Sequence, residues 1–318
     1  MEDIRFYNYE FELLDIEADF ISSNWQVKFN AIGQFEAHFP LDSDIVKIAM
    51  EHPFLVALQG KNAAIVTGKR AAEDFTVFGR TCNWLLMQRI VPAFEAKTGT
   101  AGAIACELVS KAFEDVENFA CEIDGNFSDT VSMAKEDYLS LFDVVQEWLE
   151  LGKAGHEVVF DVKQKKWIFR VLCGSERDLM ISEDNRNALN SEFCEDILEE
   201  KNAGWYQQEQ EQENEKVLVW TFLNDTGAEG LYRRECVLSA KTQEAAAQEL
   251  GRKKKISSLT AESCGPVWRK DYELGDVIRV QVKKGNCAQT VKQKITGVHL
   301  WYETGERGEQ PIMEELDV

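Results

Sequence analysis

The spacing of hydrophobic residues changes along the chain, and the order of these changes constrains the fold more than any other feature. In the first part of the chain hydrophobic and polar residues alternate; Phe35, Ala37 and Phe39, for example, are separated by polar residues and followed by Pro40. A period of two is typical of strands with one exposed face. It predicts two hairpins and a further strand, formed by segments 25–30 with 34–39, 54–58 with 64–67, and 75–79.

Further along the chain the spacing of hydrophobic residues becomes that of a helix, and later hydrophobic and polar residues alternate again. Segments 101–116 and 135–151 place hydrophobic residues at helical spacing, so we expect two amphipathic helices packed on a core. A helix is also predicted over 242–250, with Thr242 as its N-cap. Segment 195–216 is rich in Glu and Gln, which favours an exposed, flexible loop or hairpin tip. The returning alternation predicts strands at 157–161, 167–172, 216–223, 231–238, 277–282 and 291–303, the first two forming a hairpin and 216–223 pairing with 231–238.

This order of elements predicts an α+β fold dominated by β-structure, with two small β-barrel-like domains and a helical insert. With 318 residues, the chain is long enough for about two domains. Repeated strand–helix–strand units do not fit, because strands and helices are grouped along the chain rather than alternating. We expect an N-terminal barrel-like domain, the helical insert, a hairpin with an exposed acidic and Gln-rich segment, and a second β-rich domain over residues 1–95, 96–154, 155–215 and 216–318.

Charge and cysteine content narrow the function classes. The chain has 56 acidic and 35 basic residues, a formal net charge of −21. Because phosphate backbones are bound by neutralising Lys and Arg, this charge argues against sequence-reading DNA contact and against acidic lipid surfaces. We expect neither a secretory signal nor a membrane-spanning segment. The cysteines occur singly, so we expect them reduced and mostly buried, in a protein made in a reducing cytoplasm; they are Cys82, Cys106, Cys121, Cys173, Cys194, Cys236, Cys264 and Cys287.

The motifs that indicate catalysis or cofactor binding are missing from the sequence. There is no GxSxG nucleophile elbow and no complete phosphate-cradling loop. His156 and Glu157 begin like a zinc-protease pair, but Phe160 stands where the second histidine is needed. We therefore expect no catalytic residue, no cofactor and no metal. Each histidine is expected at the surface or hydrogen-bonded in the core; they are His38, His52, His156 and His299.

Three weaker patterns have structural interpretations that we prefer. Glu157, Asp161 and Lys163 imitate a metal-dependent nuclease motif, but a lysine in the turn after a strand is ordinary. The pair Glu199–Glu200 resembles glycosidase carboxylates, yet such pairs arise by chance among 56 acidic residues. Tryptophans on apolar faces are expected in the core rather than in a sugar cleft; they are Trp84, Trp148 and Trp220.

Blocks along nearly the whole chain resemble, in the same order, those of siphophage tail hub proteins. The N-terminal blocks are 11–16, 25–30, 33–40, Gly79-Arg80, 84–86 and 89–90. The later blocks are 160–170, 181–183, 187–192, Arg234-Glu235, 271–277 and 295–298. Each block is weak alone, but their shared order is fairly specific. The chain departs from the family pattern in the Gln- and Glu-rich stretch 207–214 and in a short acidic tail after Gln310.

The resemblance implies a non-enzymatic structural protein of a phage or prophage tail, a baseplate or tail-tip hub joining the tail tube to the tail tip. Such hubs form ring-shaped homotrimers of β-barrel-like domains, contact neighbouring tail proteins and let double-stranded DNA pass without specific binding. The expected location is the virion tail, after synthesis in the bacterial host cytoplasm, with no membrane partner. Structural roles, with the glycines at turns, are implied for Gly33, Phe35, Pro40, Gly79, Arg80, Leu274, Gly275 and Asp276.

Two alternatives stay open beside the hub. One is a tail-associated hydrolase or nuclease that uses acidic residues, and the other is a carbohydrate-binding tail-tip module that uses exposed aromatic residues. The charge also permits two interpretations. Acidic channel walls would repel phosphate and keep DNA from sticking during ejection. A net charge of −21 equally describes an ordinary soluble surface.

Overall fold

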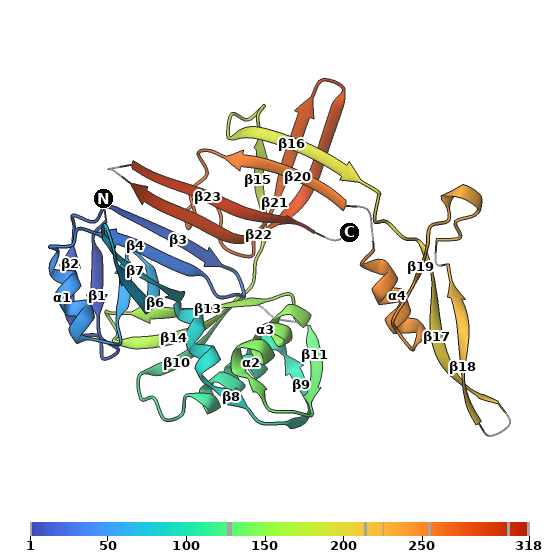
Figure 1. Cartoon of the computed structure of the whole chain (residues 1–318), viewed down its shortest axis with the longest axis horizontal. Coiled ribbons are helices and arrows are strands. Elements are labelled where there is room, and N and C mark those ends of the chain that lie inside the picture. The colour runs from blue at the N-terminus through green and yellow to red at the C-terminus, as the bar shows by residue number, and fades with distance from the viewer. Residues whose placement is uncertain are drawn as a thin grey trace. The chain divides into compact units, whose positions relative to one another are not determined.

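The computed structural model describes residues 2–125, 129–212, 215–224, 226–253, 256–303 and 306–316. The chain forms two compact units, both made from separate stretches of sequence (Figure 1). Unit 1 comprises residues 1–189, 262–280 and 290–318, and unit 2 comprises residues 190–261 and 281–289. None of the helices in the described residues is long and apolar enough to span a bilayer.

The main element of unit 1 is an eleven-stranded sheet. Its strands are β1 (Ile4–Tyr7), β2 (Leu13–Glu17), β3 (Ser22–Lys28), β4 (Gln34–Phe39), β5 (Val56–Gln59), β6 (Asn62–Ala71), β7 (Phe75–Thr81), β15 (Glu176–Ser182), β21 (Val277–Lys284), β22 (Cys287–Glu303) and β23 (Glu306–Glu315). The strand order is β15-β21-β22-β3-β4-β7-β6-β5-β1-β2, and β23 pairs with β22. In the described residues the two end strands do not pair, so the expected barrel-like closure is not formed.

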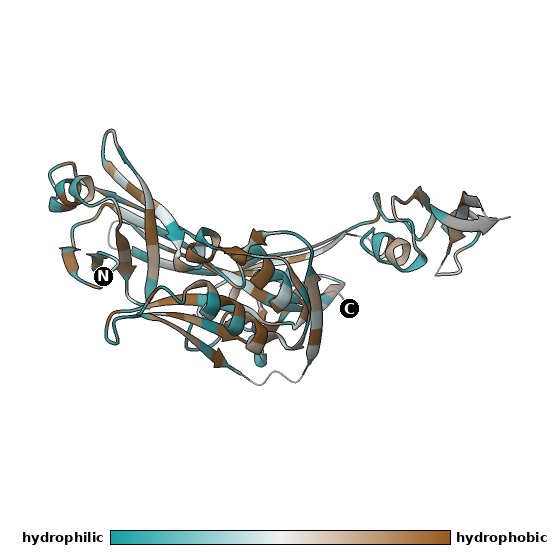
Figure 2. Ribbon diagram, turned by 90° about the horizontal axis from the view of Figure 1, so that it is seen from below, coloured by the Kyte–Doolittle hydropathy of each residue, from teal (hydrophilic) through white to brown (hydrophobic). Residues whose placement is uncertain are grey.

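The alternating segments of the sequence form this sheet as predicted. Phe35, Ala37 and Phe39 of β4 are buried, whereas Gln34 and Glu36 are exposed. Antiparallel pairing joins β3 to β4 and β5 to β6, which confirms both N-terminal hairpins. Figure 2 shows hydrophobic and hydrophilic residues alternating along many of the strands. Hydrophobic burial on one face of each strand therefore fixes the register of the sheet.

The rest of unit 1 consists of helices and short sheets, most of which pack with part of the large sheet around a shared hydrophobic core, while α1 packs on β2. The helices are α1 (Asp44–Glu51), η1 (Cys82–Gln88), α2 (Ala101–Ala112) and α3 (Leu141–Leu151). The strands are β8 (Ile90–Val91), β9 (Phe94–Thr100), β10 (Phe119–Asp124), β11 (Thr130–Lys135), β12 (Leu139–Ser140), β13 (Gly155–Asp161) and β14 (Lys166–Leu172). Helix α2 packs on α3, and the hairpin β13–β14 is confirmed. Trp148 of α3 is fully buried in this core.

The second helix is shorter than predicted, because it begins at Leu141 rather than at Lys135. Segment 135–140 is not helical, because Lys135 belongs to β11 and Leu139 belongs to β12. Leu139 pairs with Val91 of β8, so tertiary strand pairing overrides the helical spacing at this end. The first helix, α2, begins at Ala101 as predicted and ends at Ala112. The middle of the chain is therefore a mixed α and β region rather than a purely helical insert.

Unit 2 is built from a strand pair, a three-stranded sheet and one α-helix. Its elements are β16 (Ala188–Asp196), β17 (Ala203–Gln212), β18 (Glu215–Leu223), η2 (Gly230–Tyr232), β19 (Glu235–Val237), α4 (Gln243–Gly251) and β20 (Ile256–Ser263). Strand β16 pairs with β20, and the three-stranded sheet has the order β18-β17-β19. Helix α4 is capped as predicted, because the Thr242 hydroxyl accepts a hydrogen bond from the Ala245 N–H.

One prediction about unit 2 is right in part and another is wrong. The Gln- and Glu-rich segment 195–216 is predicted as an exposed loop or hairpin tip; it does form part of a hairpin, but residues 203–212 are the strand β17, paired with β18 from Glu215 onward, rather than a flexible loop. Residues 213 and 214 of that segment lie outside the described residues. The expected pair of 216–223 with 231–238 is not formed. Residues 230–232 form a short 3₁₀ turn instead of a strand, and β19 pairs in parallel with β17 rather than with β18.

Candidate functional site

The N-terminal motif positions lie together on strands β4 and β7. Phe35 pairs directly with Gly79, and its ring packs against Trp25 with ring centroids 4.2 Å apart. Gly79 lies inside β7 rather than at a turn, and a Cβ there would approach the Ile65 carbonyl oxygen to 2.0 Å. The neighbouring strand therefore leaves no room for a side chain at this position.

The same two strands hold the other N-terminal motif positions. Gly33 precedes β4 and donates its N–H to the Thr81 hydroxyl at 2.8 Å. Arg80 pairs with Gln34 and is exposed. Pro40 directly follows β4, and its carbonyl accepts the Ser43 N–H. These positions lie within strands β4 and β7 or directly at the ends of β4.

The C-terminal motif positions form a separate buried cluster around Asp276. This side chain is only 2% exposed. Its carboxylate accepts the Ser175 N–H at 2.8 Å and hydroxyl at 3.0 Å, the Glu273 N–H at 2.8 Å, and the Arg177 Nε–H at 2.6 Å. Because Ser175 directly precedes β15 and Asp276 directly precedes β21, the carboxylate ties together the starts of two adjacent strands.

Gly275 and Leu274 complete this cluster. Gly275 has φ +86°, a left-handed conformation that side chains rarely adopt, and a Cβ there would lie 2.5 Å from the Phe29 ring. Its N–H donates to the Ile295 carbonyl, and the Ile295 N–H donates to the Asp276 carbonyl. Leu274 is buried beside them. The turn thus joins β15, β21 and β22, which are neighbours in the sheet.

The residues weighed as nuclease candidates have structural partners. The Glu157 carboxylate pairs with Arg170 at 3.1 Å, across the β13–β14 hairpin. Asp161 accepts the Gln164 N–H at 2.9 Å and so shapes the turn that contains Lys163. In the described residues no group of three or more His, Cys, Asp or Glu side chains is placed to hold a metal ion.

The buried histidine also serves the core. His156 is fully buried, and its Nδ1 lies 2.8 Å from the Asn30 Oδ1. Asn30 and Gln146 each bond the other's backbone carbonyl through their side-chain amides. Burial lowers the pKa of His156 to about 3, so the imidazole is neutral near neutral pH. This polar group links β13 to the residues that follow β3 and to α3.

The cysteines are free in this structure, as expected, but the expectation that most are buried is wrong. Cys82 is buried, whereas three cysteines are exposed and the remaining four are intermediate. The exposed ones are Cys173, Cys194 and Cys287. Hydrogen bonds from Cys106 and from the Ser110 hydroxyl lower the pKa of Cys121 to about 7.

Unit 2 carries an exposed aromatic face that the sequence pattern did not predict. One side of the three-stranded sheet packs on α4 through Tyr206, Leu223 and Leu238. The other side presents a surface that we call the aromatic face, formed by Trp205, Leu218, Trp220, Phe222 and Val237. Trp220 is 50% exposed and Val237 is 69% exposed. Trp148 is buried as predicted, but the expectation that Trp220 lies in the core is wrong.

Strand register explains why these side chains share one face. Trp205 is directly opposite both Phe222 of β18 and Val237 of β19, and the Trp205 and Phe222 ring centroids are 4.8 Å apart. Trp220 and Leu218 follow Phe222 at a spacing of two, which places them on the same side. Alternating aromatic residues in 216–223 were a signal for this face, but the period alone does not tell which side the helix covers.

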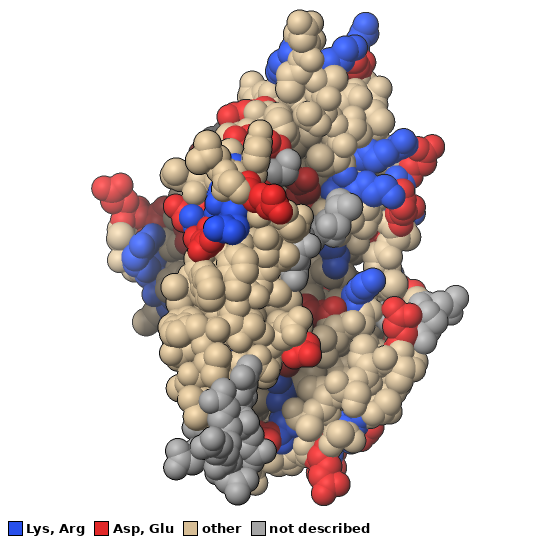
Figure 3. Space-filling view, turned by 90° about the vertical axis from the view of Figure 1, so that its right-hand side faces the viewer, with Lys and Arg blue, Asp and Glu red and all other residues tan. Residues whose placement is uncertain are grey.

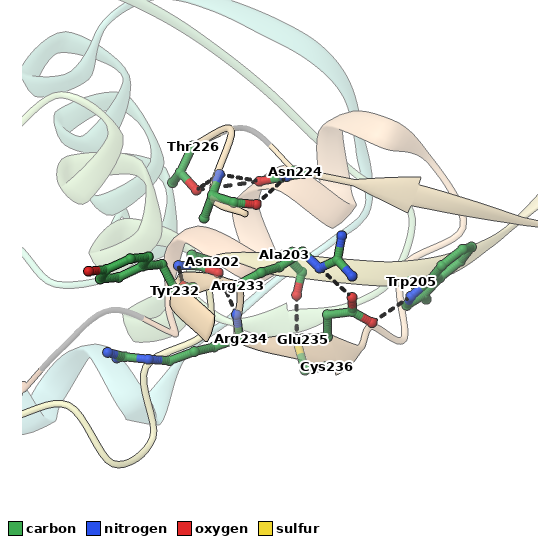
Figure 4. Close-up of polar contacts among 11 residues, drawn as sticks. Asn202, Ala203, Trp205, Asn224, Thr226, Tyr232, Arg233, Arg234, Glu235 and Cys236 are labelled. Carbon is green, nitrogen blue, oxygen red and sulfur yellow. Dashed lines mark hydrogen bonds and ion pairs between the residues drawn. The ribbon is translucent and has the colours of Figure 1, made fainter. Parts of the chain in front are cut away.

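Polar contacts beside the aromatic face hold its edge in place (Figure 4). The Glu235 carboxylate accepts the Trp205 Nε1–H at 3.0 Å and pairs with the Arg233 Nε at 2.8 Å. The Asn202 side chain accepts the Arg234 N–H at 2.8 Å and donates to the Tyr232 carbonyl at 2.9 Å. The Glu235 hydrogen bond thus orients the exposed Trp205 indole.

Charge is mixed on the one side of the molecule seen in Figure 3. Basic and acidic side chains are interspersed there with wide uncharged areas. The net charge of −21 is therefore not visible as a single acidic field on that side.

The fold is that of phage and prophage tail proteins. The chain is similar to a tail protein from Neisseria meningitidis MC58, with 10% identity and a TM-score of 0.60 over 98% of this chain and 96% of that one. It is similar to the 43 kDa tail protein of prophage MuSo2 from Shewanella oneidensis, with 11% identity and a TM-score of 0.60 over 99% and 98%. Prophage tail protein gp18 from Listeria monocytogenes EGD-e gives 11% identity and a TM-score of 0.56 over 99% and 94%.

The sequence itself assigns the family. Residues 3–312 match the family described as Siphovirus ReqiPepy6 Gp37-like protein, and the chain belongs to that family. No curated protein sequence matches the chain. The siphophage tail-protein resemblance inferred from the sequence blocks is therefore confirmed, and the chain is a phage or prophage tail structural protein.

Proposed function

We propose that this protein is the hub of a phage or prophage tail, which assembles as a ring between tail tube and tail tip and lets double-stranded DNA pass. The observation that carries this proposal is the family match over residues 3–312. Its mechanism is geometric, since a ring closes when each copy presents two different surfaces to its neighbours. A homotrimer with barrel-like domains, located in the virion tail, belongs to this proposal.

The aromatic face supports the proposal that unit 2 binds neighbouring tail proteins. Trp, Tyr and Phe are enriched at the centres of protein interfaces, and buried tryptophans often dominate the binding energy. Leu218 is 54% exposed and Val237 is 69% exposed beside the tryptophans. Exposed aliphatic side chains of this kind favour a protein partner, because covering them removes apolar surface from water.

The exposed tryptophans also support a second candidate, a carbohydrate-binding module at the tail tip. Trp205 is 40% exposed and Trp220 is 50% exposed on one sheet face. A glycan array probed with the purified protein, and with Trp220→Ser, distinguishes the two. Tight glycan binding that the substitution abolishes favours the second candidate, and no binding favours the protein interface.

Light scattering combined with negative-stain microscopy of the purified protein tests the hub. We expect a threefold ring with a central hole wide enough for duplex DNA. Assays on cell-wall and DNA substrates, with and without divalent metal, test the proposal that the chain has no catalytic activity. Metal-dependent turnover that is lost in Glu157→Gln would overturn it.

A further inference from the structure

A groove in unit 1 has an unusual charge for this chain. Its volume is about 900 Å³, and its walls come from β1, β13, β14 and the turn before β21. Basic side chains outnumber acidic ones in its lining, whereas the chain as a whole has 56 acidic and 35 basic residues. Within the described residues five of the lining basic side chains have no ion pair; they are Arg5, Lys28, Lys61, Lys163 and Arg269.

Arg269 is the most constrained of these cations. Its guanidinium carbon lies 4.1 Å from the centroid of the Trp268 ring, which holds the planar group in place. Burial lowers the pKa of this guanidinium, so the protein environment does not fully replace its hydration. The residue has φ +65°, although it is not glycine.

Nearby carboxylates do not neutralise this guanidinium by contact. Glu157 is paired with Arg170. Glu273 lies near enough for an electrostatic effect but forms no ion pair with Arg269 in the described residues. Asp276 is occupied by Arg177 and by backbone N–H groups. Arg269 is partly buried, and partial burial of a cation that has no ion pair is costly, so an anion supplied from outside the chain would be bound favourably.

We propose that the groove binds an acidic segment of a second copy of this chain, with a carboxylate of that copy on Arg269. This inference rests on the proposed ring and names one of its contacts. A chain with 56 acidic residues offers many carboxylates to a basic groove on its neighbour. The contact joins two different surfaces, which is the head-to-tail arrangement that closes a ring.

Duplex DNA fits the groove less well than a carboxylate does. DNA presents a continuous row of phosphates, each of which must be neutralised by a cation. The groove lining also contains Asp124, Glu157, Asp161 and Glu273, which would face that row. A single carboxylate from a protein needs only the one guanidinium fork and brings no row of further negative charges past these acids.

The test compares two charge-removing variants of the full chain. Arg269→Asn removes the guanidinium while keeping a residue type that tolerates positive φ. Arg279→Gln is the matched control, because Arg279 pairs with Asp178 and does not line the groove. Light scattering across a range of protein concentrations measures self-association, and circular dichroism checks that each variant is folded. Arg269→Lys provides a second variant that keeps the charge but loses the planar fork.

We expect Arg269→Asn to need about tenfold higher protein concentration for association, as loss of one charge-assisted contact implies. Arg279→Gln should match the wild type, Arg269→Lys should lie between, and a polyglutamate peptide should dissociate wild-type rings. Equal association of wild type and Arg269→Asn overturns the groove contact and leaves the ring intact. If the wild type stays monomeric at every concentration, the proposal that a second copy occupies the groove is overturned. Duplex DNA binding that Arg269→Asn abolishes, without a change in mass, also overturns it.

Discussion

Replacing Asp276 with Asn should destabilise unit 1 far more than removing its charged partner. The substitution keeps the shape of the side chain but turns one acceptor oxygen into a donor. The carboxylate is 2% exposed and accepts from two backbone N–H groups, a hydroxyl and Arg177. Breaking a buried charged network costs about 3–5 kcal/mol. Because the Arg177 side chain is 45% exposed, we discount this to roughly 2–3 kcal/mol.

The matched control is Arg177→Gln, which removes the exposed partner and leaves the backbone hydrogen bonds. It should cost less than about 1 kcal/mol. Calorimetry or urea unfolding measures both variants, and the midpoint of unit 1 should fall by roughly 5–10 °C in Asp276→Asn. Equal midpoints for the two variants would show that the ion pair, rather than the strand-joining hydrogen bonds, gives Asp276 its role.

The remaining predictions concern a titration, a turn and a thiol. Replacing His156 with Gln should remove a pH dependence of stability. The pKa of His156 is lowered to about 3 in the folded chain, whereas an unfolded histidine has a pKa near 6.5. Below pH 6.5 the unfolded chain therefore binds a proton at His156 that the folded chain does not, and the wild type becomes less stable as the pH decreases. Urea unfolding should show wild type losing about 2 kcal/mol more than the variant between roughly pH 7 and pH 5. Gly275→Ala should cost over about 2 kcal/mol in thermal unfolding, whereas Gly227→Ala, with φ +65° and open space, should cost about 1 kcal/mol. Alkylation at Cys121 should reach half its maximal rate near pH 7, and Ser110→Ala should move that midpoint upward. A stability difference between wild type and His156→Gln that does not change with pH would contradict the buried neutral histidine. Equal losses of stability in the two glycine variants would contradict the role of space at Gly275, and an alkylation midpoint unchanged in Ser110→Ala would contradict the hydrogen bond to Cys121.

The local sequence pattern predicts an element correctly where a segment pairs with its neighbour along the chain. The β3–β4 and β13–β14 hairpins follow from alternation and a short turn, and both are present. The helix α4 follows from its composition and its Thr242 cap. These signals lie within a few residues of the elements that they predict.

Long-range pairing was not predictable from the sequence. Strand β22 joins β3 through register pairs such as Leu300 with Trp25, which are far apart along the chain. Leu139 was assigned to a helix because its pairing with Val91 is invisible to a local window. Trp220 has the apolar neighbours of a core residue, yet it is exposed because α4 covers only the opposite face.

The candidate site shows the same limit. Asp276 and Gly275 were singled out by motif, but their hydrogen bonds to Ser175 and Ile295 come from distant segments. Arg269 lies outside every motif, and the alternation in 216–223 does not tell which side of its sheet stays exposed. Both depend on which side chains the fold leaves without partners, and that is a property of tertiary structure.

Cryo-electron microscopy of purified phage or prophage tails, with the chain identified by mass spectrometry, tests the hub most directly. We expect the protein in the tail fraction as a threefold ring between tube and tip, with a channel that duplex DNA can pass. Absence of the protein from assembled tails, or its presence only as a component outside the ring, would contradict the hub.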